Sequence, residues 1–167
     1  MQYNKGDNVV YGNYGVCKIR DIRLMSFSSE RMKEKYYVLS PLGSKSSTYY
    51  IPVSASPEVL RLPLTKEEID ALLEKAKSIH FDWQENRQLR ADRFHSVISK
   101  GISEELIALI ECLYKRKQEL QKNNKTLSSS DDSLFSSAEK LLTDEFSFSL
   151  EISKDEVSSY ISDFFKG

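Results

Sequence analysis

The sequence predicts an α+β protein built from two modules: a small N-terminal β-barrel over residues 1–62 and an all-α bundle of about five helices over residues 63–167. Within about the first 60 positions, short segments alternate apolar and polar residues, which is typical of strands. After residue 62 the apolar residues follow the 3.6-residue period of amphipathic helices. A series of strands followed by a series of helices indicates an α+β fold or two separate modules.

Four segments of the N-terminal module carry the β-branched and aromatic residues that strands favour: residues 8–11, 16–22, 35–39 and 47–53. Turn residues lie between them, among them Gly12-Asn13 and the stretch from Pro41 to Ser44. Pro52 cannot donate a main-chain hydrogen bond, so it ends its strand or places that strand at an edge. Short strands with this hairpin spacing predict a strongly bent sheet or an SH3/Tudor-like barrel.

Helix-start signals and apolar periodicity divide the C-terminal module. Thr65 and Glu68 have the spacing of a capping box, which indicates the first helix. Gly101 is suited to ending a helix because glycine adopts the left-handed backbone conformation without strain. The expected helices begin near Thr65 and then cover about residues 83–99, residues 103–122, a fourth segment from Leu127-Ser128 onward, and residues 153–165 with Ser153 and Glu156 as the cap.

The formal net charge of −1 hides an uneven distribution. Residues 1–84 carry 12 basic and 10 acidic side chains, residues 85–125 carry 9 and 6, and residues 126–167 carry 3 and 9. The segment after Trp83 is therefore basic and the last part of the chain is acidic. Such an asymmetry indicates an interaction surface and says nothing about the fold.

Several function classes leave no trace in the sequence. No apolar stretch approaches the roughly 20 residues that span a bilayer, and the N-terminus lacks a secretory signal. We therefore expect a cytoplasmic protein in which Cys17 and Cys112 are reduced thiols. His80 and His95 lack the spacing of metal ligands, and we expect both to be buried or half-buried structural residues. Without phosphate-loop or nucleophile motifs, a binding module is expected, with no catalytic residue, cofactor or metal and no enzymatic activity.

The residues around the single tryptophan form the most informative segment. Trp83 lies at the expected start of the second helix, and Arg87, Arg90 and Arg93 follow at three-residue steps along one side of that helix. A row of guanidinium groups beside an aromatic ring suits a phosphate backbone, because the ring can stack on bases or wedge between them.

A purely structural interpretation of this segment stays open. Trp83 would then pack between the two modules, and the arginines would pair with acids such as Glu85 and Asp92. Lys115 and Arg116 make the second half of the third helix basic, and part of that charge is the usual complement to a helix dipole.

The order of these features resembles the CarD family of bacterial RNA polymerase-binding transcription factors. The stretch from Lys5 to Val16 is similar to the family's opening, in which a Gly-Asp pair precedes a Val-Val-Tyr strand and a glycine turn. Residues 35–39 and 50–53 are similar to its later strands. The features that follow in the family's order are Trp83, the arginine helix, Gly101 and the start of the fourth helix.

For residues 1–62 this resemblance implies a Tudor-like RNA polymerase-interacting domain, which also occurs in transcription-repair coupling factors. Such a domain binds the polymerase β subunit, partly by adding its sheet edge to a strand of the partner. Met25 and Tyr50 stand where some members have arginines that contact polymerase. The implied polymerase-binding residues are Met25, Tyr49, Tyr50 and Ile51.

For residues 63–167 the resemblance implies a helical domain that binds promoter DNA in the minor groove at the upstream edge of the melted −10 region. The tryptophan would wedge into the fork and stabilise the open complex. The candidate DNA-binding residues are Trp83, Arg87, Arg90, Arg93, Lys115 and Arg116. The protein would be nucleoid-associated in the bacterial cytoplasm, with no membrane partner, as a monomer or as a dimer swapped through the barrel edge.

One stretch departs from the family pattern. Where some members have Lys-Arg after the cap of the fourth helix, this chain has Asp131-Asp132-Ser133, which would repel phosphate. No DNA contact is expected there. The alternative to a DNA-binding regulator is a protein-only adaptor, in which the barrel binds polymerase and the helices bind another protein through the acidic last third.

Overall fold

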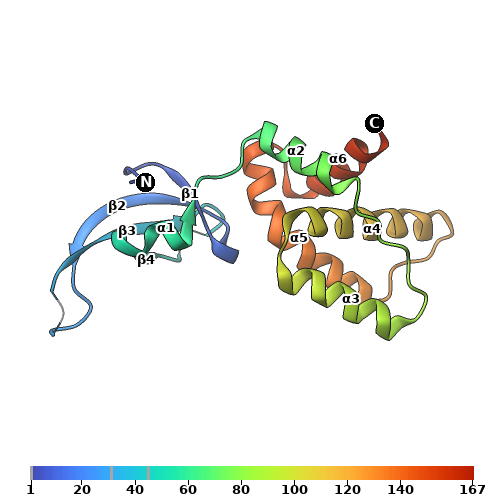
Figure 1. Ribbon diagram of the computed structural model, residues 1–167, viewed down its shortest axis with the longest axis horizontal. Helices are drawn as coiled ribbons and strands as arrows, with labels where there is room; N and C mark the ends of the chain where they lie inside the picture. The colour runs from blue at the N-terminus through green and yellow to red at the C-terminus, as the bar shows by residue number, and fades with distance from the viewer. Residues whose placement is uncertain (1, 31, 45) are drawn as a thin grey trace. The chain divides into compact units, whose positions relative to one another are not determined.

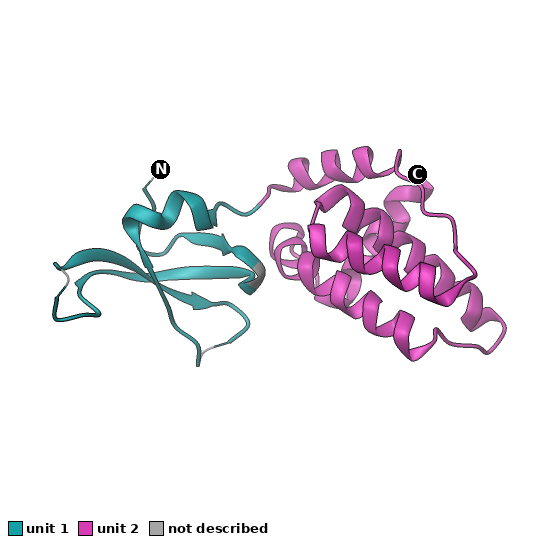
Figure 2. Cartoon of the chain, turned by 60° about the horizontal axis from the view of Figure 1, so that its bottom comes forward, with its two compact units in different colours: residues 1–63 teal, residues 64–167 magenta. Residues whose placement is uncertain are grey.

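The computed structural model describes residues 2–30, 32–44 and 46–167. It has an α+β fold, in which one antiparallel sheet precedes the long helices (Figure 1). The chain divides into two compact units, which we call unit 1 (residues 1–63) and unit 2 (residues 64–167) (Figure 2). Within the described residues, no helix is long and apolar enough to cross a membrane.

Unit 1 is a five-stranded antiparallel sheet with the strand order β4–β3–β2–β1–β5. The strands are β1 Asn8–Tyr11, β2 Val16–Met25, β3 Glu34–Pro41, β4 Tyr49–Pro52 and β5 Leu60–Arg61. The described residues of the unit also form three short helical segments: η1 Gly12–Tyr14, η2 Val53–Ala55 and α1 Ser56–Val59. No ladder joins β4 to β5 in the described part of the unit, so closure into a Tudor-like barrel stays a prediction.

Strand β2 is longer than the sequence indicated and reaches Met25. A β-bulge interrupts its pairing with β3, and the pairing resumes beyond the bulge. Ile19 pairs with Leu39 and Asp21 pairs with Val38, which leaves Arg20 as the extra residue. Before the bulge, β2 contributes to a small core. Beyond it, the side chains of β2 are exposed or half-buried. The core residues are Tyr3, Val9, Cys17, Ile19, Tyr37, Leu39, Ile51 and Leu60.

Unit 2 contains five helices around one apolar core. They are α2 Lys66–Ala76, α3 Arg87–Lys100, α4 Ser103–Lys122, α5 Ser129–Leu150 and α6 Lys154–Lys166. The inward positions expected from periodicity are largely buried, including Ile69, Leu73, Leu109, Leu142 and Ile161. The predicted capping boxes at Thr65 and Ser153 are both confirmed.

Two expectations for unit 2 are wrong. The second helix begins at Arg87 and not near Trp83, because the Asn86 side chain accepts a hydrogen bond from the Leu89 N–H at 3.0 Å and so caps the helix there. His80 and His95 are exposed rather than buried or half-buried. His95 faces solvent because the buried residues of α3 lie on its other side, at positions 90, 94 and 97.

Candidate functional site

Trp83 lies in the loop between α2 and α3, four residues before the helix, and its side chain is half-buried against the core of unit 2. The indole ring meets the Phe94 ring edge-on, with centroids 6.2 Å apart. Two guanidinium groups lie over the indole, that of Arg90 at 4.6 Å and that of Arg116 at 5.0 Å from the ring centroid. The ring is therefore held by residues of two helices and is not a free surface group.

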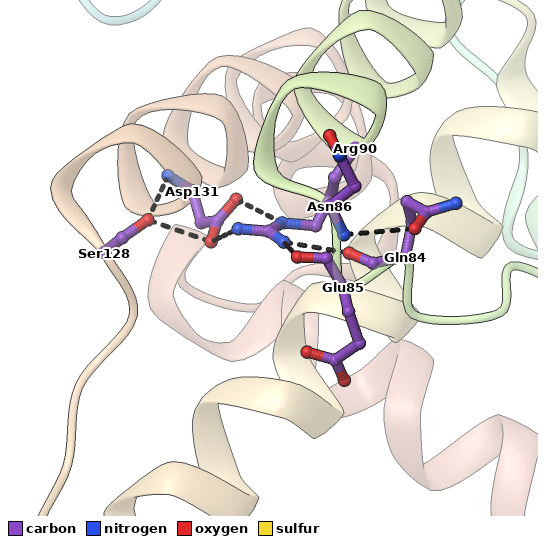
Figure 3. Close-up of polar contacts among 6 residues, drawn as sticks. All are labelled: Gln84, Glu85, Asn86, Arg90, Ser128 and Asp131. Carbon is purple, nitrogen blue, oxygen red and sulfur yellow. Dashed lines mark hydrogen bonds and ion pairs between the residues drawn. The ribbon is translucent and has the colours of Figure 1, made fainter.

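Arg90 is a buried residue rather than one of a row of exposed arginines. Its Nε and Nη2 donate to Asp131 Oδ1 and Oδ2, both at 2.9 Å, and this bidentate pair joins α3 to the first turn of α5 (Figure 3). Its Nη1 donates to the main-chain carbonyl oxygens of Gln84 at 2.8 Å and Glu85 at 3.4 Å. With an 8% exposed side chain, Arg90 is not available to a phosphate backbone, and we assign it a structural role.

The carboxylate of Asp131 is fixed from its other side by the helix cap. Ser128 Oγ accepts a hydrogen bond from the Asp131 N–H at 3.1 Å and donates one to Asp131 Oδ2 at 2.9 Å (Figure 3). Burial acts to raise the pKa of Asp131, but the hydrogen bonds from Arg90 and Ser128 outweigh it and lower the pKa below the ordinary aspartate value. Asp131 is thus a charged buried partner of Arg90, and its charge is not free to repel phosphate.

The other predicted DNA-binding residues are accessible. Arg87, at the first position of α3, and Arg93 are exposed, and the Arg93 guanidinium lies 4.6 Å from the centroid of the Phe81 ring. The exposed Lys115 reaches only a weak contact, 3.7 Å from Glu111 Oε1. The Cys112 thiol of α4 donates to the Phe81 main-chain oxygen at 3.7 Å, so Arg93, which lies over the Phe81 ring, is near this part of α4. Lys115 follows Cys112 three positions later.

Arg116 is half-buried, so its exposure lies between that of the buried Arg90 and that of the exposed cations. Its guanidinium covers Trp83, its Nη1 lies 3.7 Å from Glu119 Oε2, and its buried Nε has no hydrogen-bond partner. We call Trp83, Arg87, Arg93, Lys115 and Arg116 together the Trp83 surface.

Three residues of this site were not predicted from the sequence. Asp131 stands 41 positions after Arg90, and Gln84 and Ser128 contribute through a main-chain oxygen and a cap. The structural interpretation of the sequence did expect arginine–carboxylate pairs, but with Glu85 and Asp92. The signal for Asp131 was present in the Ser128 helix-start pattern, which places an acid in the first turn of α5.

A cavity of about 350 Å³ beside the same loop is lined, among other residues, by Glu111 and Cys112. Burial raises the pKa of the Cys112 thiol, although the charge of Arg93 acts to lower it. The thiol therefore favours its protonated form, the reverse of what a nucleophile needs. Burial also raises the pKa of Glu111, whose Oε2 has no hydrogen-bond partner. Among the residues that the structure describes, no group of three or more His, Cys, Asp or Glu side chains is placed to hold a metal ion.

The second candidate surface belongs to unit 1. In the described sheet β4 pairs with β3 only, so the main-chain groups on the other side of β4 are open to a further strand. Tyr50 on β4 has a 39% exposed side chain, and its ring centroid lies 5.5 Å from that of Phe27. Phe27 is 62% exposed and also packs edge-on against Tyr36. The edge is therefore flanked by exposed aromatic surface.

Comparison with known proteins identifies this unit. Residues 3–62 match the model of the CarD-like/TRCF RID domain family. Unit 1 is a CarD-like/TRCF RID domain. The match implies RNA polymerase as a partner and a transcription-related function, and it agrees with the CarD resemblance of the sequence. No curated protein matches the chain.

Within the RID domain, the four predicted polymerase-binding residues present different groups. Met25 is the half-buried last residue of β2. Tyr49 is also half-buried, and its ring centroid lies 4.8 Å from that of Tyr14. The Tyr50 side chain is exposed, whereas the Ile51 side chain is 6% exposed and belongs to the core. Ile51 can therefore offer a partner only its main chain.

Proposed function

We propose that this chain is a non-enzymatic regulator of bacterial transcription initiation. The RID domain binds the polymerase β subunit, and unit 2 contacts promoter DNA in the minor groove at the upstream edge of the melted −10 region. The protein acts in the cytoplasm at the nucleoid, as a monomer, and shifts the equilibrium toward the open promoter complex because it binds that state more tightly.

The polymerase contact uses the β4 edge. An extended strand of the partner adds to β4 through main-chain hydrogen bonds, and this recognition tolerates the tyrosine and methionine that stand where some relatives have arginine. Tyr50 and Phe27 provide apolar contact beside the added strand. Pro52 limits the ladder at the end of β4, because it has no N–H to donate.

The DNA contact uses the Trp83 surface. The observation that carries this part of the proposal is an indole ring on a loop, held by guanidinium groups and accompanied by the accessible cations Arg87, Arg93 and Lys115. An aromatic group that wedges into an opened junction avoids most of the unstacking free energy that an intact duplex would demand. The cations contact phosphates on either side and position the protein without reading sequence.

Promoter opening with purified bacterial polymerase tests the proposal. Trp83→Ala is expected to shorten the lifetime of the open complex by about tenfold, which corresponds to the loss of one aromatic–base contact. Phe148→Ala is the matched control, since Phe148 is an exposed aromatic residue on α5 of the same unit and is not part of the Trp83 surface. Open complexes of equal lifetime with wild type and Trp83→Ala would show that Trp83 is not a wedge.

A further inference from the structure

Trp83 belongs to no helix or strand, so its orientation depends on its neighbours. The loop that carries it is fixed by Arg90, which lies over the indole and also donates to the carbonyl oxygens of Gln84 and Glu85, the two residues that follow the tryptophan. One side chain therefore contacts both the ring and the main chain next to it. Figure 3 shows its contacts with the main chain.

Arg90 is itself held in a single orientation. The two parallel hydrogen bonds to Asp131 fix the plane of the guanidinium group, and the Ser128 cap fixes the carboxylate. Arg116, by contrast, has only a 3.7 Å contact to Glu119, and its side chain is 34% exposed. Of the two guanidinium groups on the indole, the one from Arg90 is the fixed one.

A stabilising role alone accounts poorly for this pair. The desolvation of two buried charges offsets much of their attraction, so well-packed apolar residues of similar volume stabilise a fold equally well or better. What an apolar pair does not provide is a planar cation of fixed orientation over an aromatic ring, together with two hydrogen bonds to the loop.

We propose that Arg90, held by Asp131, is a positioning residue that sets the orientation of Trp83 for its contact with DNA. The proposal rests on the function proposed above for Trp83. The series of contacts Ser128–Asp131–Arg90–Trp83 then links the start of α5 to the Trp83 surface. Asp131, which the family pattern predicted would repel phosphate, supports the DNA contact indirectly by holding Arg90.

The test removes both charges together, so that no buried charge is left unpaired. The variant Arg90→Met with Asp131→Asn keeps a chain of similar length over the ring, and Arg90→Lys keeps the charge but loses the planar fork. Thermal unfolding shows which variants are folded at the assay temperature. Because Trp83 is the single tryptophan of the chain, its fluorescence reports on the ring directly.

In the folded double variant, the emission of Trp83 is expected to shift to the red, with a higher quenching constant for acrylamide, and Arg90→Lys is expected to fall between that variant and wild type. Arg93→Met is the matched control for the spectrum, because it removes a guanidinium group from α3 that lies over Phe81 instead of Trp83. Unchanged emission and quenching in the folded double variant would overturn the proposal.

The second measurement is affinity for a fork-junction DNA in the polymerase complex. The double variant is expected to lose about threefold to tenfold, the usual effect of one cation–π contact. In a Trp83→Ala background the same two substitutions should cause no further loss, since Arg90 acts through the ring. An additive loss there would overturn the proposal. If Trp83→Ala alone leaves DNA contact intact, the proposed function fails, and the fluorescence result still decides whether Arg90 orients the ring.

Discussion

Arg90 and Arg93 show how differently two arginines of one helix are used. They stand three positions apart on α3, yet Arg90 is buried in an ion pair with Asp131 and Arg93 is exposed over Phe81. The difference arises because Arg90 shares a face with the core residues Phe94 and Val97. A guanidinium group on that face requires a buried acceptor, and Asp131 provides it.

Asp131 is expected to make the stability of unit 2 fall in acid. Its pKa in the folded protein is lowered, so its charge stabilises the native state above the unfolded-state pKa, and this contribution is lost as the pH falls through the folded-state pKa. Asp131→Asn should lower the free energy of unfolding by about 3 kcal/mol near pH 7, because it leaves Arg90 unpaired. Urea unfolding followed by Trp83 fluorescence at about pH 7 and about pH 3 measures the free energy of unfolding of wild type and of the variant.

The difference between Asp131→Asn and wild type should shrink as the pH falls, because protonation of Asp131 first in the unfolded state and then in the folded state removes its contribution. Glu111 has a raised pKa and acts in the opposite direction, but it is present in both proteins and cancels from their difference. A difference that stays constant over the whole range would contradict the assignment of the charged form to Asp131.

Helices α2, α3 and α5 of unit 2 begin at side-chain caps, at Thr65, Asn86 and Ser128, whereas α4 begins after Ile102 without one. In the capping box of α2, Thr65 Oγ1 accepts from the Glu68 N–H at 3.2 Å, and Glu68 Oε2 accepts from the Thr65 N–H at 2.8 Å. At the C-terminal end of α3, Gly101 has a φ of 65°. This left-handed backbone conformation would strain any residue with a Cβ atom.

Thr65→Ala is expected to lower the free energy of unfolding of unit 2 by about 1 kcal/mol, because the N-terminal N–H groups of α2 lose their acceptor. Urea unfolding followed by Trp83 fluorescence measures the change. Thr126→Ala is the control, since Thr126 is exposed in the loop between α4 and α5. Equal losses in the two variants would show that the capping box does not stabilise the helix.

In unit 1 the β-bulge at Arg20 separates two parts of β2 that have different surroundings. The residues before it build the core, whereas Leu24, near the end of the strand, is 62% exposed. Exposed apolar side chains mark an interaction surface where they form one contiguous patch, as the contacting rings of Phe27 and Tyr50 do. Phe27 and Tyr50 belong to the same region, which supports a polymerase contact at the neighbouring edge of β4.

For the molecule as a whole, the near-neutral charge is consistent with DNA binding that depends on polymerase. The basic excess lies in residues 85–125. Arg90 is paired with the buried Asp131, so fewer cations of this segment are available to phosphates. Under the proposed function, tethering by the RID domain would raise the local concentration of unit 2 at the promoter, and a small basic surface would then be sufficient.

DNA affinity of the free protein is expected to be weak and to fall with salt. If Arg87, Arg93 and Lys115 each contact one phosphate, the logarithm of the affinity falls with the logarithm of the salt concentration with a slope of about −2.7. The affinity then falls about 40-fold between about 50 and about 200 mM salt. A variant with all three changed to glutamine should show a nearly flat response. If the wild-type protein shows no salt-dependent DNA binding, the protein-only adaptor becomes the better account.

Much of the architecture follows from local sequence. The period of the apolar residues marks the change from strands to helices, and the caps at Thr65, Ser128 and Ser153 mark helix starts. The RID domain is recognisable from the Gly-Asp and Val-Val-Tyr opening near the N-terminus. These features depend on interactions between residues a few positions apart, so the sequence alone determines them.

The tertiary structure decided which charged groups are free. Trp83 was expected at a helix start, among three equivalent arginines, but it lies on a loop under Arg90 and Arg116. The partner of Arg90 comes from 41 positions later, and although the Ser128 cap places an acid at Asp131, nothing in the local pattern shows that this acid pairs with Arg90. Such pairings depend on how α3 packs against α5. A buried charge is unfavourable unless an opposite charge lies next to it in space, and that partner can be far away in the sequence.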